Sequence, residues 1–157
     1  MLNVVIFYRN SEDLLIIAFF LLVIHIIFNI AKSSSYNQVY KLLSVGYNLY
    51  LNGNYTKAII LFNKALLKDP EAQEAFLYGG ISRYYLNEYD KALNSLNNVI
   101  KLDKNENQAY YWRGLTYFQL DRISESITDL KKAIELGNNE AIDFLKKIEN
   151  SKKIENY

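Results

Sequence analysis

Three glycines, Gly46, Gly80 and Gly114, lie 34 residues apart in this chain of 157 residues. Residues of similar chemical type recur at fixed distances from each glycine. The matching columns are Leu42, Phe76 and Tyr110; Ala58, Ala92 and Ser126; Phe62, Leu96 and Leu130; and Ala65, Val99 and Ala133. A fixed period of roughly 20–50 residues is typical of solenoids, in which stacked copies of one small unit share a continuous core. The period therefore predicts a repeat solenoid.

Each unit contains two apolar stripes at helical spacing, separated by residues that favour a turn. The turns are expected at Asn52-Gly53-Asn54, Asn87-Glu88 and Asp121-Arg122. The glycine column and the small residues of the Ala58 column are expected to face each other, so that the two helices of a unit approach closely. A leucine at these glycines would force the helices apart.

A unit with a large apolar residue, a glycine, Ala-x3-Phe and a late proline resembles the tetratricopeptide repeat. The first unit is the most typical, with Leu42, Gly46, Ala58, Phe62, Ala65 and Pro70. The departures are Arg83 in place of an aromatic residue, Ser126 in place of alanine, and Lys104 and Asn138 in the column of Pro70. The resemblance implies an all-α solenoid of three helix-turn-helix repeats, at residues 39–72, 73–106 and 107–140.

Residues 141–157 are predicted to form a capping helix and tail. Ala141, Phe144, Leu145 and Ile148 make an apolar stripe at helical spacing, and lysines supply much of the other face. Terminal repeats of solenoids need such a cap with a polar outer face. The alternative is a tail that acts as a ligand.

The segment from Leu14 to Ala31 contains 18 residues without a formal charge. As a helix it would be ~27 Å long, close to the hydrocarbon thickness of a bilayer. It is predicted to be a transmembrane helix, preceded by a tail at residues 1–13 and followed by a linker at residues 32–38 whose serines cap the first repeat helix.

A cleaved signal peptide is the alternative interpretation of this segment, because Ala31 and Ser33 are small residues at a spacing suitable for a peptidase. The chain would then be a secreted or periplasmic envelope protein that acts in self-assembly. The length of the apolar run and the lack of a basic cluster before it favour the anchor. Lys32 and Lys41 against Arg9 slightly favour a cytoplasmic repeat domain.

The composition offers little for catalysis or nucleic-acid binding. The net charge is +1, with 18 basic and 17 acidic residues. There is no cysteine, and the single histidine, His25, lies in the apolar segment without the partners of a metal site or proton relay. We therefore predict no enzyme activity, no metal, no cofactor and no nucleic-acid partner, with an accessory subunit of an enzyme as a further alternative. The oligomeric state is left open.

In the tetratricopeptide family, function resides in a concave groove lined by the first helix of each repeat. The resemblance implies that the groove here is aromatic, with the best partner-binding candidates Tyr47, Tyr78, Ile81, Tyr85, Tyr111 and Trp112. Members that bind chaperone C-terminal carboxylates use lysine, arginine and asparagine at positions that here are Leu43, Tyr47, Tyr78, Gln108 and Trp112.

This groove predicts a membrane-anchored adaptor for an apolar or aromatic segment of a protein or peptide partner, itself associated with the membrane. The alternative is that the tyrosines only pack the solenoid.

Overall fold

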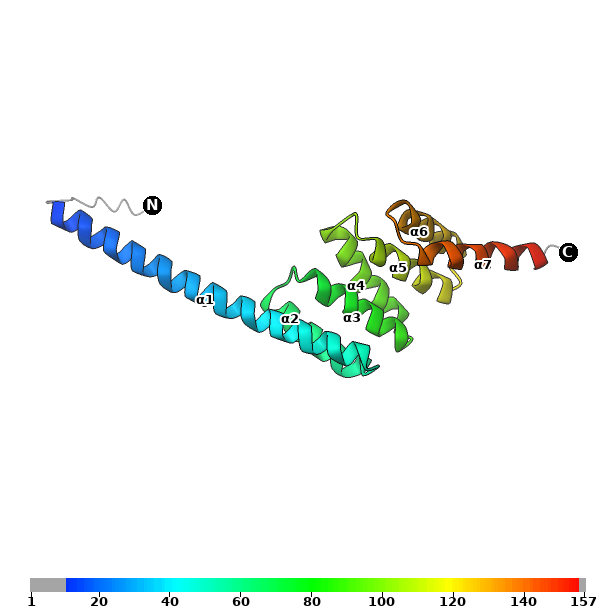
Figure 1. Ribbon diagram of the computed structural model, residues 1–157, viewed down its shortest axis with the longest axis horizontal. Helices are drawn as coiled ribbons and strands as arrows, with labels where there is room; N and C mark the ends of the chain where they lie inside the picture. Colours follow the sequence, from blue (N-terminus) through cyan, green and yellow to red (C-terminus); the bar gives the residue numbers. More distant parts are fainter. Residues whose placement is uncertain (1–10, 156–157) are drawn as a thin grey trace, which may run out of the picture. The chain divides into compact units, whose positions relative to one another are not determined.

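The structure is a computed structural model that describes residues 11–155, with side chains described for residues 14–150. The first ten residues of the predicted tail and residues 156–157 lie outside this range. Within it the chain is all α-helical, which confirms the predicted fold class (Figure 1). The helices are α1 (Ser11–Leu51), α2 (Tyr55–Lys68), α3 (Gln73–Tyr85), α4 (Tyr89–Leu102), α5 (Asn107–Gln119), α6 (Ile123–Glu135) and α7 (Glu140–Glu155).

The chain divides into two units, Met1–Gln38 and Val39–Tyr157, and each is described by itself. In the first unit, the apolar residues from Leu14 onward are helical and most of their side chains are exposed. By length and composition, α1 contains a stretch that could cross a membrane, with mean hydropathy 2.9 and no buried residue.

The segment 32–38 is helical, which corrects one expectation about the linker. Ser33, Ser34 and Ser35 lie within α1, so they do not cap the start of a repeat helix. The physical reason is that α1 already runs through these residues, and the backbone N–H groups inside a helix have partners in the preceding turn.

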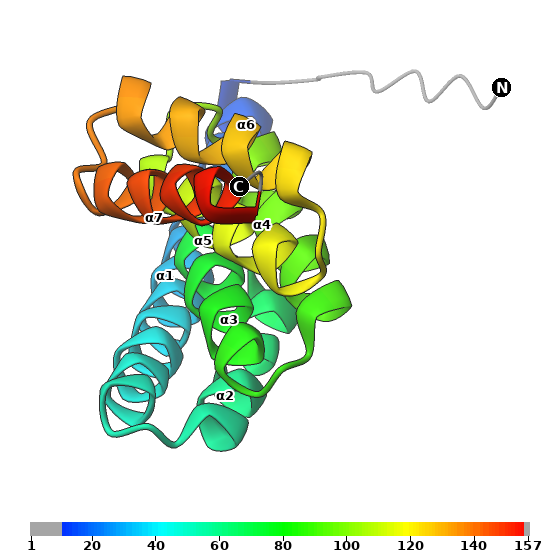
Figure 2. The ribbon, with the colours of Figure 1, turned by 90° about the vertical axis from the view of Figure 1, so that its right-hand side faces the viewer.

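In the second unit, each helix from α2 to α7 packs against the next one along the chain (Figures 1 and 2). The repeat columns identified in the sequence form the centre of this stack. Phe62, Leu96 and Leu130 are almost fully buried. The small residues of the columns that begin at Ala58 and Ala65 have no exposed surface.

The helix α7 completes the core at the end of the solenoid, as expected of a cap. Its residues Ala141 and Ile148 are buried with Leu130 and Ala133 of α6. The departure from proline at Asn138 supports this arrangement, because its Oδ1 accepts a hydrogen bond of 3.0 Å from the backbone N–H of Ala141. A buried side chain thus caps the first turn of α7.

The repeat glycines pack against large residues, which corrects the expected pairing with small ones. A Cβ atom on Gly46 would lie 2.8 Å from Phe62, and one on Gly80 would lie 3.1 Å from Cγ of Leu96. Gly114 has the equivalent contact with Leu130 at 3.1 Å. The glycines therefore make room for the largest buried side chain of the following helix.

The turns within the three repeats share one backbone conformation. Gly53, Asn87 and Asp121 all have positive φ, at 72°, 59° and 59°. Asparagine and aspartate tolerate the left-handed region better than other residues with a Cβ atom. The predicted turn positions are confirmed, and one residue in each sets the sharp reversal between the helices.

Two arginines link successive repeats through equivalent partners. Nη1 and Nη2 of Arg83 donate to Ser95 Oγ and Asn63 Oδ1, each at 3.2 Å. In the next repeat, Arg113 donates to Asn97 at 2.7 Å and binds Asp129 through two hydrogen bonds of 2.6 and 2.8 Å.

Asn97 and Asp129 follow Asn63 and Ser95 by 34 residues, whereas the two arginines come from different columns. Arg113 occupies the column of Gly79, and the guanidinium of Arg83 lies over Gly79, with Nη1 3.1 Å from the position of a Cβ atom there. The unusual Arg83 therefore fills a space that the next repeat fills from one helical turn earlier.

Candidate functional site

A row of aromatic rings extends over the first helices of the three repeats. It consists of Tyr47 and Tyr50 on α1, Tyr78 and Tyr85 on α3, and Tyr111 and Trp112 on α5. We call these six residues the aromatic band. Sequence reasoning selected all of them except Tyr50 as best candidates.

Ring contacts join the band from one end to the other. The rings of Tyr47 and Tyr78 have centroids 4.7 Å apart, and Tyr78 lies 5.5 Å from Tyr50. Trp112 continues the row, with centroids 5.6 Å from Tyr85 and 5.5 Å from Tyr111. Edge-to-face and tilted pairs at these distances are favourable and limit the motion of each ring.

Tyr55, the first residue of α2, connects the two halves of the band. Its ring lies 6.0 Å from that of Tyr50 and stacks on Tyr85 at 4.7 Å with an interplanar angle of 7°. Sequence reasoning did not select Tyr55. A signal was present, because Tyr89 occupies the same column 34 residues later and also contacts a band neighbour, the ring of Tyr84.

Ile81 is a core residue with 2% of its surface exposed, although it was one of the predicted site residues. It packs with Leu77, Leu96, Val99 and Ala109. Its face of α3 is covered because α5 follows closely in the solenoid, and a short aliphatic side chain does not reach past that contact. The structure therefore does not place Ile81 on the aromatic band.

The band combines buried and exposed surface. Tyr47 and Tyr85 are 37% and 45% exposed, and the other four residues are half-buried. Tyr78 also packs against two core clusters, and Trp112 packs against one of them. Packing therefore holds the half-buried rings in place, while Tyr47 and Tyr85 offer the most accessible apolar surface.

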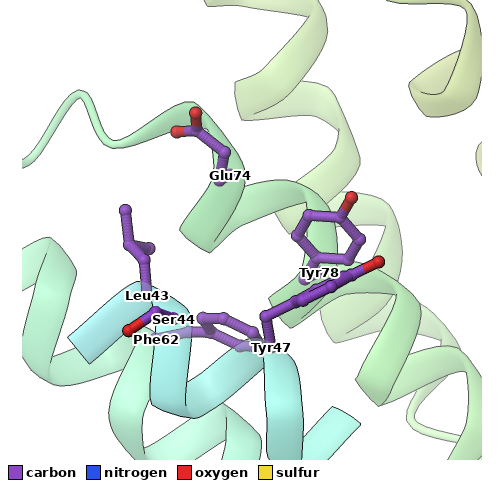
Figure 3. A pocket seen from close by; sticks show the side chains of 6 residues that line it. All are labelled: Leu43, Ser44, Tyr47, Phe62, Glu74 and Tyr78. Atoms are coloured by element: carbon purple, nitrogen blue, oxygen red, sulfur yellow. The ribbon is translucent and has the colours of Figure 1, made fainter. Parts of the chain in front are cut away.

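A pocket with a volume of about 210 Å³ opens at the first end of the band (Figure 3). It is lined by Leu43, Ser44, Tyr47, Phe62, Glu74 and Tyr78. Figure 3 shows side chains from α1 and α3 on its two sides, with the carboxylate of Glu74 among otherwise mainly apolar groups. Drug-sized ligands usually occupy pockets of roughly 300–1,000 Å³, so this pocket suits one side chain of a larger partner.

The tyrosine hydroxyls of the band remain protonated well above neutral pH. Burial, followed by the neighbouring tyrosines, raises the pKa of Tyr50 to about 12. Burial also raises the pKa of Tyr78, Tyr85 and Tyr111. At neutral pH the band is therefore uncharged and presents apolar rings with hydroxyl groups that can donate hydrogen bonds.

Chemical groups for metal binding do not gather in the described part of the chain, where no three His, Cys, Asp or Glu side chains are placed to hold an ion. The second pocket, of about 250 Å³, is lined by Arg113, Tyr117, Ser124, Glu125, Thr128 and Asp129. Its most buried polar groups, Arg113 and Asp129, already satisfy each other. This second pocket is therefore a feature of the polar link between repeats.

Comparisons with known proteins agree with the repeat fold. Residues 80–121 match a sequence profile described as a TPR repeat, and residues 108–139 match one described as a tetratricopeptide repeat. No curated protein sequence matches the chain.

Among solved structures, the first TPR of Spaghetti (RPAP3), bound to an HSP90 peptide, has a TM-score of 0.70 and 25% identity, covering 73% of this chain and 93% of that one. The Yersinia enterocolitica type III secretion translocator chaperone SycD also has a TM-score of 0.70, with 23% identity, covering 74% and 95%. The repeated helix pairs, the buried columns and these matches together identify the chain as a tetratricopeptide repeat protein.

Proposed function

We propose that this protein is a membrane-anchored adaptor that binds an apolar or aromatic peptide segment of a protein partner on its aromatic band, without performing chemistry. The observation that carries the proposal is the continuous row of rings across all three repeats, with Tyr47 and Tyr85 exposed. Rigid aromatic side chains contribute much contact area and lose little conformational entropy on binding. The small pocket beside Tyr47 can accept one anchoring side chain.

Related folds support a peptide as the ligand. The first TPR of Spaghetti is bound to the HSP90 peptide SRMEEVD, and SycD has been solved in complex with a peptide of the translocator YopD. The chain differs from carboxylate-binding members of its family at the ligand positions, which here include Leu43, Tyr78 and Trp112. A partner of this protein is therefore recognised by features other than a C-terminal carboxylate.

The Tyr47→Ala, Tyr85→Ala double variant is expected to weaken partner binding by about 30-fold or more while leaving the fold intact. Aromatic hot-spot residues typically contribute about 2 kcal/mol or more to binding, and these two are the most exposed of the band. The measurement is capture of the partner by the full chain from detergent-solubilised membranes, followed by titration with the captured partner.

The matched control is the Ile60→Ala, Leu67→Ala variant, which removes exposed apolar surface from α2. Unfolding of each variant is followed by the fluorescence of Trp112, the single tryptophan. If the tyrosine variant folds normally and recovers as much partner as the wild type, the band is not the binding surface.

The anchor is proposed for residues 14–31, since their apolar side chains are exposed and form no core of their own. We expect the wild-type protein to stay with membranes during alkaline carbonate extraction. Phe20→Arg should release much of it, because an arginine at the centre of a span costs about 2.5–3.5 kcal/mol on insertion. Phe20→Leu is the control and should remain in the membrane.

The competing proposal of a cleaved signal peptide makes a different prediction for the same fractions. Small residues at Ala31 and Ser33 favour processing there. The mature protein would then be soluble in carbonate and begin near Ser33. Amino-terminal sequencing of the wild-type protein decides between the two, and an intact chain that is soluble without detergent contradicts both.

A further inference from the structure

Acidic side chains surround the aromatic band. Glu74 lines the pocket with Tyr47 and Tyr78. Glu106 is linked to the band through Gln108, whose backbone N–H donates to Glu106 Oε1 at 3.1 Å and whose side-chain oxygen accepts from Trp112 Nε1 at 3.1 Å. The band thus has carboxylates beside its first and last helices.

A third carboxylate, that of Glu140 at the start of α7, acts on the far end of the band. Its charge contributes to the raised pKa of Tyr111 and, less strongly, of Tyr85, in both cases after burial. Glu106 and Glu74 contribute in the same way at Tyr78, after burial and the neighbouring Tyr47. Negative charge is therefore felt along the whole band.

The basic side chains of the two helices that carry most of the band are committed elsewhere. Arg83 of α3 binds Asn63 and Ser95, and Arg113 of α5 binds Asn97 and Asp129. Among the ion pairs between described residues, none includes Glu74, Glu106 or Glu140. The negative charge at the band is therefore available to a ligand.

We propose that the peptide segment bound by the aromatic band carries lysine or arginine among its apolar residues. A cation is attracted by the faces of tyrosine and tryptophan rings and by carboxylates beside them, and the two attractions act on the same group. An acidic segment would meet repulsion from the same carboxylates. This inference rests on the proposed function and adds the charge of the partner.

The test is selection of peptides from a random displayed library by the full chain in detergent micelles. Peptides enriched on the wild type relative to the Tyr47→Ala, Tyr85→Ala variant are expected to combine apolar residues with lysine or arginine. In the tightest of them, replacing the basic residues by glutamine should weaken binding by about tenfold, and replacing them by glutamate should weaken it further.

The protein side is tested with Glu74→Gln, Glu140→Gln, which removes two exposed carboxylates and leaves Glu106 to cap α5. This variant should bind the basic peptide about fivefold more weakly, with a smaller dependence on salt. The matched control is Glu135→Gln, Glu149→Gln, in which two exposed carboxylates elsewhere are removed, and it should bind like the wild type.

The outcomes separate the charge of the ligand from the existence of the site. Enriched peptides that are neutral or acidic, or an unchanged affinity in the Glu74→Gln, Glu140→Gln variant, overturn the basic ligand and leave the band as a binding surface. No enrichment over the tyrosine variant overturns both. A stable dimer that excludes peptide from the band would assign this surface to a second copy of the chain, which also overturns the proposal.

Discussion

Arg113→Ala is expected to lower the free energy of unfolding of the repeat unit by about 3–5 kcal/mol, because it leaves a buried carboxylate without its partner. The side chain of Asp129 is 7% exposed and both of its oxygens accept hydrogen bonds from Arg113. Burial alone would lower the pKa of Arg113, but the hydrogen bonds and charge of Asp129 raise it, so the pair is ionised. The variant also loses the link to Asn97 of the preceding repeat.

The measurement is urea unfolding of the full chain in detergent, followed by the fluorescence of Trp112. Lys132→Ala is the control, since its pair with Glu135 is exposed and should contribute about 0–1 kcal/mol. Adding Asp129→Ser to Arg113→Ala should restore part of the loss, because serine is the residue that the preceding repeat uses in this column, at Ser95. Equal destabilisation by Arg113→Ala and Lys132→Ala would show that the buried pair is not important for stability.

Gly80→Leu is expected to destabilise the same unit by about 1–3 kcal/mol through overpacking. A Cβ atom at this position would lie 3.1 Å from Cγ of Leu96 and 3.2 Å from Cβ of Ser95, before the rest of the leucine is added. Leu96 has no exposed surface, so it cannot move aside into solvent. The helices α3 and α4 must separate to accept the larger side chain.

Two further variants make this result specific. Lys101→Ala, at an exposed position of α4, should leave the unfolding midpoint within error of the wild type. Combining Gly80→Leu with Leu96→Ala should recover stability relative to Gly80→Leu alone, because the smaller residue vacates the contact. An unchanged midpoint for Gly80→Leu would contradict the observed packing of the glycine column.

The aromatic band was largely predictable because tyrosine and tryptophan stand at the positions where the repeat family carries its ligand residues. Five of the six predicted residues contact one another directly or through Tyr50 and Tyr55. The sixth, Ile81, shares their face of α3 by helical spacing but lies in the core. Periodicity identifies the face of a helix, whereas the depth to which a neighbouring helix covers that face depends on how the repeats stack.

The sequence by itself determined the repeat period, the all-α class, the turn positions and the buried columns, because each of these depends on residue type at short or regular spacing. Only the tertiary structure decided which large residue each glycine accommodates, and that Arg83 and Arg113 reach equivalent partners from different columns. A guanidinium on a long flexible stem can fill one site from more than one backbone position. Residue spacing alone therefore does not specify where such a side chain ends.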